Sequence, residues 1–449
     1  MAAESDLLTL PALPPLAEGA RVHVAYSGGL DSTVLLHALA AAGTPGLAAI
    51  HIHHGLQAAA DDWAAHCSAG AAALGVPLTV LRAHVAPDAA EGPEGAARSA
   101  RYALLRSAMA PGDLLVTAHH RADQAETVLL RLLRGTGVHG LAGMRVLGEF
   151  APGRLWRPLL DQPRTRLLAH ARAQGLCWLD DPHNADPRYA RSWLRTEIVP
   201  RLQARHPQVE AALARSARLA EEAAGLLDEL AASDLAAQAE GEALAIPGLL
   251  RLSPARRHHL VRHWLAVQGF RPPFAAMLDR LDRELLVAAV DAEPRLRWPG
   301  CELRRHRERL YAMTPLGDPD PGTRPLHWHD GCRLLLPDGD GELVARSPPP
   351  WPIEVRRPRP GETIRPAGDR LTRDCRKLFQ SRGIPVWLRP RLPVLDAGDG
   401  HLCILGLAAT EGWRAAAGSA GWSVAWHHQR AGLSSPRAWP DAPLARDCP

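Results

Sequence analysis

The sequence predicts an α/β protein with a parallel sheet in its N-terminal domain, followed by a helical domain and a small α+β C-terminal domain. Residues 1 to about 135 alternate short apolar runs with longer amphipathic stretches, which is typical of a parallel sheet covered by helices. Residues 208 to about 285 place Ala, Leu, Glu and Arg at helical spacing, whereas 326–428 hold short strand-like runs and many turn residues. With 449 residues, the chain is long enough for two or three such domains.

The elements of the first domain can be placed in order. Strands are expected at 22–26, 47–53, 78–84 and 114–119, and helices at 32–42, 58–74, 94–109 and 123–134. Later helices are expected at 163–174 and 188–205, and a strand pair at 296–298 and 302–312. We therefore expect domains at 1–206, 207–315 and 326–428, followed by a disordered, proline-containing tail at 429–449.

Composition narrows the class of protein. Lys and Arg number 52 against 48 acidic residues, and Lys377 is the single lysine, so we attribute the arginine excess to a GC-rich genome. No apolar run reaches ~18 residues and the N-terminus does not have the layout of a secretory signal, so we expect no membrane partner. The seven cysteines are dispersed without a C-x-x-C pair, which indicates reduced thiols and a cytoplasmic protein.

A glycine-containing turn follows the first expected strand and precedes a helix. It reads Ser27-Gly28-Gly29-Leu30-Asp31-Ser32. This arrangement directs backbone N–H groups and a helix dipole at a phosphate, and the glycines allow close approach. The serine hydroxyls add donors, and Asp31 can hold Mg²⁺ against phosphate oxygens. No lysine follows, so the Walker pattern is not met. The alternative is a plain glycine turn capped by Asp31.

Two carboxylates begin the helix after the fourth expected strand. Asp123 and Glu126 are three residues apart and share one helical face, where they can hold an ammonium group or a metal ion. The same spacing at a helix start is also that of a capping box, so the residues alone leave both interpretations open.

Arginines and glycines near these segments are less specific. Arg98 and Arg101 share one helical face, and Arg188, Arg191 and Arg195 form one stripe. Either set can be a solvated surface or a contact to phosphate. The glycine pattern at 135–140 follows a helix instead of a strand, so we reject a dinucleotide site there and expect a mobile loop beside the active site.

Basic groups continue through both later domains, which suits a long polyanion such as RNA better than a small metabolite. Lys377 is notable there, because a compact point charge is retained in a chain that otherwise uses arginine.

The S-G-G-x-D-S turn is the signature of the PP-loop, and it resembles the pyrophosphate-binding loop of ATP pyrophosphatases. Together with 51–56, 94–102, 119–144, 157–160 and 180–200, it resembles the tRNA(Ile)-lysidine synthetase (synthase) family. Residues 355–362, 377–379 and 384–389 are similar to the C-terminal domain of that family.

The resemblance implies an ATP- and Mg²⁺-dependent ligase. It would join free L-lysine to C2 of the wobble cytidine in tRNA(Ile) with a CAU anticodon, through an adenylated cytidine, with release of AMP and pyrophosphate and a change of codon from AUG to AUA. Asp123 and Glu126 would hold the lysine, and Arg101 and Arg195 would contact phosphate. The catalytic residues implied by the resemblance are Asp31, Asp123, Glu126 and Arg195. The residues implied to bind the nucleotide are Ser27, Gly28, Gly29, Leu30, Asp31, Ser32 and Arg101. The residues implied to bind the lysine or tRNA substrates are Asp123, Glu126 and Lys377.

The chain departs from the family pattern at three places. Ala122 stands where the family has a first aspartate, His183 replaces a serine, and 192–194 replace a triplet that contains asparagine. The loss of a carboxylate at Ala122 leaves a catalytically impaired tRNA-binding protein as one alternative. A tRNA thiolase with a PP-loop is the other, although its expected cysteine pair is missing from the sequence. A homodimer also stays open.

Overall fold

A computed structural model describes residues 8–53, 60–83, 92–180, 190–289, 292–317, 319–320 and 324–427. The chain divides into two compact units, 1–226 and 227–449, which are described separately. The domain boundaries expected at 206 and 315 stay a proposal, and the expected disordered tail at 429–449 lies outside the described residues.

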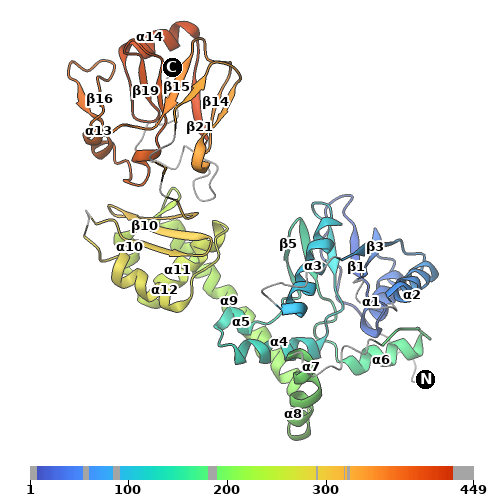
Figure 1. The fold of residues 1–449 in the computed structure, drawn as a ribbon. Helices are drawn as coiled ribbons and strands as arrows, with labels where there is room; N and C mark the ends of the chain where they lie inside the picture. Colours follow the sequence, from blue (N-terminus) through green and yellow to red (C-terminus); the bar gives the residue numbers. More distant parts are fainter. Residues whose placement is uncertain are drawn as a thin grey trace. The chain divides into compact units, whose positions relative to one another are not determined.

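The first unit is built on a six-stranded sheet (Figure 1). Its order is β3-β2-β1-β4-β6-β5, in which β5 and β6 form an antiparallel hairpin and all other neighbours are parallel. The strands are β1 (Val22–Ala25), β2 (Leu47–His53), β3 (Leu78–Arg82), β4 (Leu114–Val116), β5 (Leu147–Phe150) and β6 (Gly153–Trp156). The four strands expected from apolar runs are thereby confirmed: β2 has the expected bounds, and β1, β3 and β4 end one to three residues earlier.

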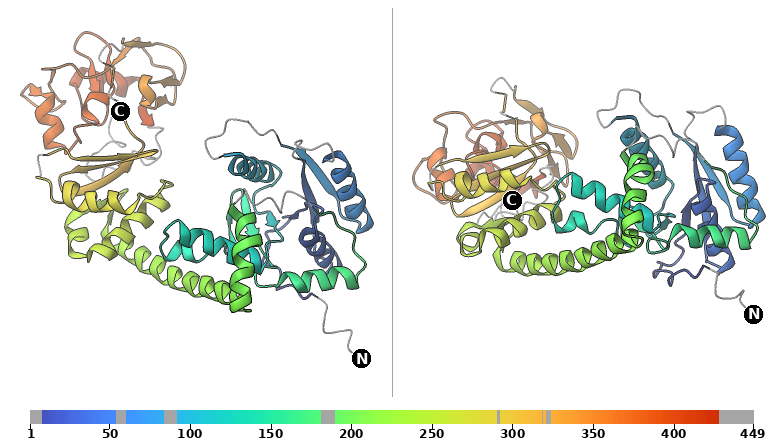
Figure 2. Two further views of the ribbon diagram at one scale, coloured as in Figure 1. Left: turned by 60° about the horizontal axis from the view of Figure 1, so that its bottom comes forward. Right: turned by 90° about the horizontal axis from the view of Figure 1, so that it is seen from below.

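Alternating side chains of the central strands fill two separate cores. Leu114 and Val116 point to one face, where they pack with residues of α1 (Leu30–Ala41), α2 (Ala60–Ala73) and α6 (Arg164–Ala173). Leu115 points to the other face and joins Leu105 of α3 (Gly92–Ser107). This period of two buries both faces of the parallel sheet, as apolar strands require. Figures 1 and 2 show α3 on one side of the sheet and α1 with α2 on the other.

The helices of this unit confirm the expected alternation with strands. They are α1 (Leu30–Ala41), α2 (Ala60–Ala73), α3 (Gly92–Ser107), α4 (Arg121–Leu133), α5 (Val138–Leu141), α6 (Arg164–Ala173), α7 (Ala190–Trp193), α8 (Val199–Arg205) and α9 (Val209–Gln238). A π-helical segment, Leu194–Ile198, joins α7 to α8. The long helix α9 continues past residue 226 into the second unit.

The connections define where a ligand can bind. From β1 the chain passes to β2 and β3 on one side, whereas β4 lies on the other side of β1. Helices that follow β1 and β4 therefore diverge, and the carboxyl ends of these two strands flank a crevice of the kind that binds ligands in open parallel sheets. The Ser27–Ser32 turn follows β1, and the start of α4 follows β4.

The second unit begins with helices packed on a five-stranded sheet of order β7-β8-β11-β10-β9. The elements are β7 (Ala239–Glu240), β8 (Ala243–Ala245), α10 (Ile246–Arg251), α11 (Pro254–Val267), α12 (Ala275–Arg280), β9 (Arg295–Trp298), β10 (Cys301–His306) and β11 (Arg309–Met313). The single strand expected at 302–312 is wrong in detail. Arg307 has a φ of 54°, so the chain turns there and forms the β10–β11 hairpin.

The C-terminal part of this unit is α+β, as expected. One sheet has the order β12-β15-β18-β19-β20, and a second has the order β13-β14-β21. The strands are β12 (Leu326–Trp328), β13 (Arg333–Leu335), β14 (Glu342–Ala345), β15 (Ile353–Arg356), β16 (Thr363–Ile364), β17 (Arg373–Asp374), β18 (Val394–Asp396), β19 (Leu402–Ile404), β20 (Ala408–Ala409) and β21 (Val424–His427). The helices are α13 (Cys375–Ser381) and α14 (Glu411–Ala420).

Among the described residues, every helix is too short or too polar to cross a membrane.

Candidate functional site

The turn after β1 is held together by its own hydroxyl groups. The Oγ atoms of Ser27 and Ser32 lie 3.0 Å apart, and Ser32 Oγ donates to the Gly29 carbonyl at 3.1 Å. Gly28 has a φ of 79°, and a Cβ built there would lie 2.7 Å from Cys67 Sγ, so only glycine fits. Leu30 is the first residue of α1, and its side chain is buried.

Asp31 does not cap this helix. The N-cap is Gly29, which leaves the Asp31 carboxylate available to a ligand. Its Oδ1 is shielded from solvent and accepts no hydrogen bond among the described residues. The capped-turn alternative is therefore wrong for Asp31.

At the start of α4 the capping box is real but involves different residues from those expected. His120 is the N-cap, and its backbone N–H donates to Asp123 Oδ2 at 3.0 Å. Glu126 takes no part in the cap and is only 2% exposed. A buried carboxylate needs a partner, because its desolvation is costly.

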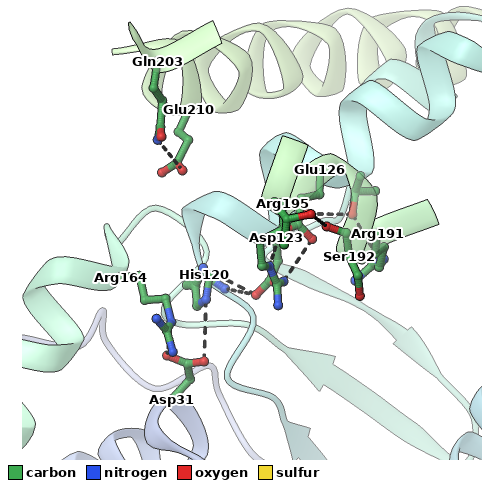
Figure 3. Close-up of polar contacts among 12 residues, drawn as sticks. Asp31, His120, Asp123, Glu126, Arg164, Arg191, Ser192, Arg195, Gln203 and Glu210 are labelled. Atoms are coloured by element: carbon green, nitrogen blue, oxygen red, sulfur yellow. Dashed lines mark hydrogen bonds and ion pairs between the residues drawn. The ribbon is translucent and has the colours of Figure 1, made fainter. Parts of the chain in front are cut away.

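That partner is Arg195, which reaches α4 from the π-helical segment (Figure 3). Its Nε donates to Glu126 Oε1 at 2.7 Å, and its Nη2 donates to Glu126 Oε2 at 3.1 Å and to Asp123 Oδ1 at 3.2 Å. Both carboxylates therefore converge on one cationic group. π-Helical turns are frequent at functional sites, since they change the direction in which side chains project.

A line of alternating charges connects this pair to the glycine turn. His120 Nδ1 lies 3.5 Å from Asp123 Oδ2, and His120 Nε2 lies 3.6 Å from Asp31 Oδ2. On the far side of Asp31, Arg164 Nε lies 3.8 Å from Oδ1. Figure 3 shows these side chains in one region at the carboxyl ends of the strands. The turn after β1 and the carboxylates of α4 therefore share one site.

The surroundings alter the acidity of each group. Burial raises the pKa of Glu126, and Arg195 only partly offsets this. Burial also opposes ionisation of Asp123, but His120, through its side chain and its backbone N–H, and Arg195 outweigh it and lower the pKa of that carboxyl. Burial disfavours the charged form of His120, yet Asp31 and Asp123 raise its pKa overall.

His119 differs from its neighbour. Burial, with the charges of Arg157, Arg101 and Arg191, lowers the pKa of His119 against the opposing effect of Asp123, so this imidazole is neutral. Its Nδ1 lies 2.9 Å from Thr117 Oγ1.

The site residues fit a magnesium ion at Asp31. Hard cations prefer carboxylate oxygens, and Asp31 Oδ1 is a shielded acceptor without a hydrogen bond among the described residues. Arg164 is a cation, and Asp31 and Asp123 raise the pKa of the nearby His120, so any ion there would need the added negative charge of a phosphate ligand.

The remaining expected residues are distributed as follows. Arg191 Nη2 donates to Thr127 Oγ1 at 3.1 Å, so Arg191, like Arg195, contacts α4. Arg98 and Arg101 lie over the Tyr102 ring, at 5.1 and 5.4 Å from its centroid.

Lys377 is exposed on α13 of the second unit. The Glu94 side chain and residues His54, Arg188 and 181–184 lie outside the described residues.

The glycine loop after α4 is anchored at two points. Arg131 Nη1 donates to the carbonyls of Gly140 and Gly143 at 2.8 and 2.7 Å. The Gln124 amide pairs with both backbone groups of Met144 at 2.8 and 3.0 Å. Because α5 lies inside this loop, it is more ordered than the glycine content indicates.

Sequence reasoning missed two members of the site. His120 is not singled out by any motif in the sequence, although its position three residues before Asp123 is a usable signal. Arg164 lies 133 positions from Asp31, and no local pattern joins them.

Three family models match the chain in order. A PP-loop domain matches residues 5–202, a TilS substrate binding domain matches 244–311, and a TilS substrate C-terminal domain matches 353–426. The expected resemblance of both ends of the chain is thereby confirmed.

Similar proteins extend over most of the chain. The tRNA(Ile)-lysidine synthase of Alkalilimnicola ehrlichii is 47% identical over 407 residues, which cover 88% of this chain and 91% of the relative. The tRNA(Ile)-lysidine synthase of Xanthomonas campestris pv. campestris is 44% identical over 87% of this chain and 90% of its own length. That of Methylococcus capsulatus is 41% identical over 87% and 92%, respectively. The chain belongs to the tRNA(Ile)-lysidine synthase family.

Proposed function

We propose that this protein is an ATP-dependent ligase that joins L-lysine to C2 of the wobble cytidine in an isoleucine tRNA with a CAU anticodon. The observation that carries the proposal is the line of alternating charges from Asp31 at the glycine turn to Glu126 on α4. It joins a phosphate-binding element to a carboxylate pair that already holds a cation.

The first step activates the cytidine. Its C2 oxygen attacks the α-phosphorus of ATP, the bond to the β-phosphate breaks, and pyrophosphate leaves with the negative charge. Backbone N–H groups and the hydroxyls of Ser27 and Ser32 would neutralise that charge. Mg²⁺ held by Asp31 would add to this neutralisation when bound. The raised pKa of His120 favours its protonated form, which would add positive charge between the turn and α4.

The second step needs a neutral amine. The lysine ε-ammonium has a pKa of ~10.4 in water, so it must lose a proton before its nitrogen attacks C2 and AMP departs. Glu126 is the better proton acceptor of the pair, because burial raises its pKa while the pKa of Asp123 is lowered. Asp123 would remain ionised and orient the amine.

Arg195 occupies the place that this lysine requires. A guanidinium and an ammonium are both cations that donate to carboxylates, and Arg195 already donates to both oxygens of Glu126. We propose that lysine displaces Arg195, whose side chain is 43% exposed and free to turn toward phosphate. Arg195 would thus pair with Glu126 before lysine binds and contact phosphate after lysine has bound.

The tRNA would be held by the second unit. Lys377 and Arg376 are exposed on α13, and Asp374 caps that helix. Phosphate contacts of this kind position an RNA and make its binding salt-dependent.

Sulfur transfer fits the chain less well. Cys67 lies against Gly28, but burial raises the pKa of its thiol to about 12, so it is not a thiolate at neutral pH. No disulfide joins the six cysteines that the structure describes.

The test is incubation of the full chain with ATP, labelled lysine and bacterial tRNA, followed by nucleoside analysis. Lysidine in the digest supports the proposal, together with AMP formed in equal amount. Binding of tRNA without any lysidine would favour the impaired-enzyme alternative that Ala122 raises, and a thiolated nucleoside made with a sulfur donor would favour the thiolase.

A further inference from the structure

Helix α2 packs one face directly against the glycine turn. Trp63, Cys67 and Gly70 follow at i, i+4 and i+7, so they share that face. The Trp63 indole Nε1 donates to the Ser27 carbonyl at 2.7 Å. A Cβ built on Gly28 would meet Cys67 Sγ at 2.7 Å and Trp63 Nε1 at 3.1 Å.

The same helix also approaches the end of β1. A Cβ built on Gly70 would lie 2.7 Å from the phenol oxygen of Tyr26, so the absence of a side chain at Gly70 allows the close approach. Tyr26 is 2% exposed and Cys67 is fully buried. The contact is therefore a packed interface, and Trp63 lies at its edge beside the turn.

A second contact holds the other side of the turn. The Leu179 backbone N–H, in the segment after α6, donates to the Gly28 carbonyl at 3.0 Å. The carbonyls of two successive residues, Ser27 and Gly28, thus accept hydrogen bonds from two elements far apart in sequence.

These two bonds fix where the next N–H groups point. In a planar trans peptide the carbonyl and the following N–H lie on opposite sides. With the Ser27 carbonyl tied to Trp63, the Gly28 N–H is turned away from α2. With the Gly28 carbonyl tied to Leu179, the Gly29 N–H is turned toward the hydroxyl side of the turn, where it lies 3.4 Å from Ser27 Oγ.

We propose that Trp63 is a positioning residue of the nucleotide-binding turn: its indole N–H holds the Ser27–Gly28 peptide in the orientation that presents an N–H to the pyrophosphate portion of ATP. The inference rests on the proposed use of ATP at this turn. Peptide units in a glycine turn can rotate at little cost in free energy. A hydrogen bond from a residue outside the turn therefore pre-organises the site before the nucleotide binds.

The test compares Trp63→Phe with the wild-type chain. Phenylalanine keeps an aromatic ring at this position and removes the N–H donor together with the five-membered ring that carries it. Loss of one hydrogen bond predicts a rise of about three- to tenfold in the KM for ATP and in the inhibition constant for pyrophosphate. The KM for lysine should change less than about twofold, because Glu126 and Asp123 do not contact Trp63.

The control and a second variant keep the result interpretable. Ser68→Ala lies on the exposed side of α2, where its hydroxyl bonds only the Ala64 carbonyl, and it should behave as wild type. Leu179→Pro removes the other donor and should also raise the KM for ATP. Thermal unfolding of each variant, with and without ATP, separates lost affinity from lost folding.

The outcomes distinguish two failures. If wild-type protein shows no ATP binding by calorimetry, the proposed function fails. If the wild type binds ATP and Trp63→Phe binds it equally well, the positioning role of Trp63 is wrong while the proposed function stands. Equal rises in the KM for ATP and for lysine would also overturn it, because they indicate a general loss of structure.

Discussion

Arg195 and Glu126 form a two-point ion pair, with Nε and Nη2 of the guanidinium on the two carboxylate oxygens at 2.7 and 3.1 Å (Figure 3). Glu126 is buried, whereas Arg195 is nearly half exposed. One partner is thus fixed within the fold and the other can leave. Under the proposed function, Arg195 compensates the charge of this buried carboxylate until the lysine ammonium replaces it.

Glu126→Gln should weaken lysine binding selectively. The amide keeps the shape of the side chain but loses the charge, so the KM for lysine should rise about tenfold to a hundredfold, and the KM for ATP should change little. Steady-state kinetics with each substrate varied in turn checks this. Glu197→Gln is the matched control, because Glu197 pairs with Arg201 on the protein surface. Similar rises for both substrates would show that Glu126 has a structural role only.

Arg195→Gln should change the pH profile. The guanidinium lowers the pKa of Glu126 against the raising effect of burial, so its loss raises that pKa further. Because the proposed step needs an ionised Glu126, the acid limb of kcat/KM for lysine should move to higher pH. Arg201→Gln on the same helical run should leave the limb unchanged. A limb that moves to lower pH, or stays in place, would contradict the pairing.

Asp31→Ala should abolish exchange of label between pyrophosphate and ATP. The carboxylate is the proposed ligand of the magnesium ion, and its removal should lower the exchange rate by at least about a hundredfold. Asp62→Ala, an exposed acidic residue in the first turn of α2, serves as the control. Full exchange activity in Asp31→Ala would remove Asp31 from the nucleotide site.

Lys377→Gln should weaken binding of tRNA and reduce its salt dependence. Loss of one phosphate contact predicts a slope of log K against log salt that is shallower by about one. Lys377→Arg keeps the charge and should retain the slope. Point variants are preferable to truncation here. Tyr311 and Met313 pack in one core with Trp387 and Phe379, and removal of the C-terminal part would expose that core. An unchanged slope in Lys377→Gln would exclude this residue from the RNA contact.

Asp113→Ala should destabilise the first unit. This buried carboxylate accepts from the backbone N–H groups of Arg21 and Ala110, both at 2.8 Å, and lies 2.9 Å from His23 Nε2. Two unsatisfied N–H groups predict a loss of about 3 kcal/mol in the free energy of unfolding at neutral pH. Asp161→Ala, at an exposed position, should change it by less than about 0.5 kcal/mol.

The pH dependence gives a second check on Asp113. Burial opposes its ionisation, but the hydrogen bonds from Arg21, Ala110 and His23 lower its pKa overall. A depressed folded pKa means that the stabilisation is fully present above the unfolded value of about 3.9 and is lost as pH falls through the folded pKa. The difference between wild type and Asp113→Ala in chemical denaturation should therefore shrink below about pH 4. A difference that grows on acidification would contradict this.

The sequence predicts the four parallel strands β1 to β4 well, because each is a short apolar run between turn residues, but it does not predict the β5–β6 hairpin of the same sheet. It predicts the glycine turn for the same reason, since the whole element lies within six residues. The pairing of Arg195 with Glu126 joins positions 69 apart and depends on a π-helical turn, for which the sequence carries no periodic signal. The hairpin at Arg307 was missed because a non-glycine residue takes the left-handed conformation.

The capping box shows how a local pattern can be assigned to the wrong residues. Asp123 does take part in a cap, but with His120, one turn earlier than expected. Spacing alone could not separate this from the substrate role, because burial of Glu126 and the approach of Arg195 are tertiary effects. Trp63 was overlooked for a similar reason, since its partner Ser27 lies 36 positions away.

The most direct measurement is a crystal structure of the full chain with L-lysine and a non-hydrolysable ATP analogue. The account predicts the lysine Nζ within about 3.2 Å of Glu126 and Asp123, Arg195 displaced from that pair, and the phosphates on the turn formed by Ser27 to Ser32. Lysine bound elsewhere while Arg195 remains on Glu126, or phosphates that avoid the turn, would contradict it.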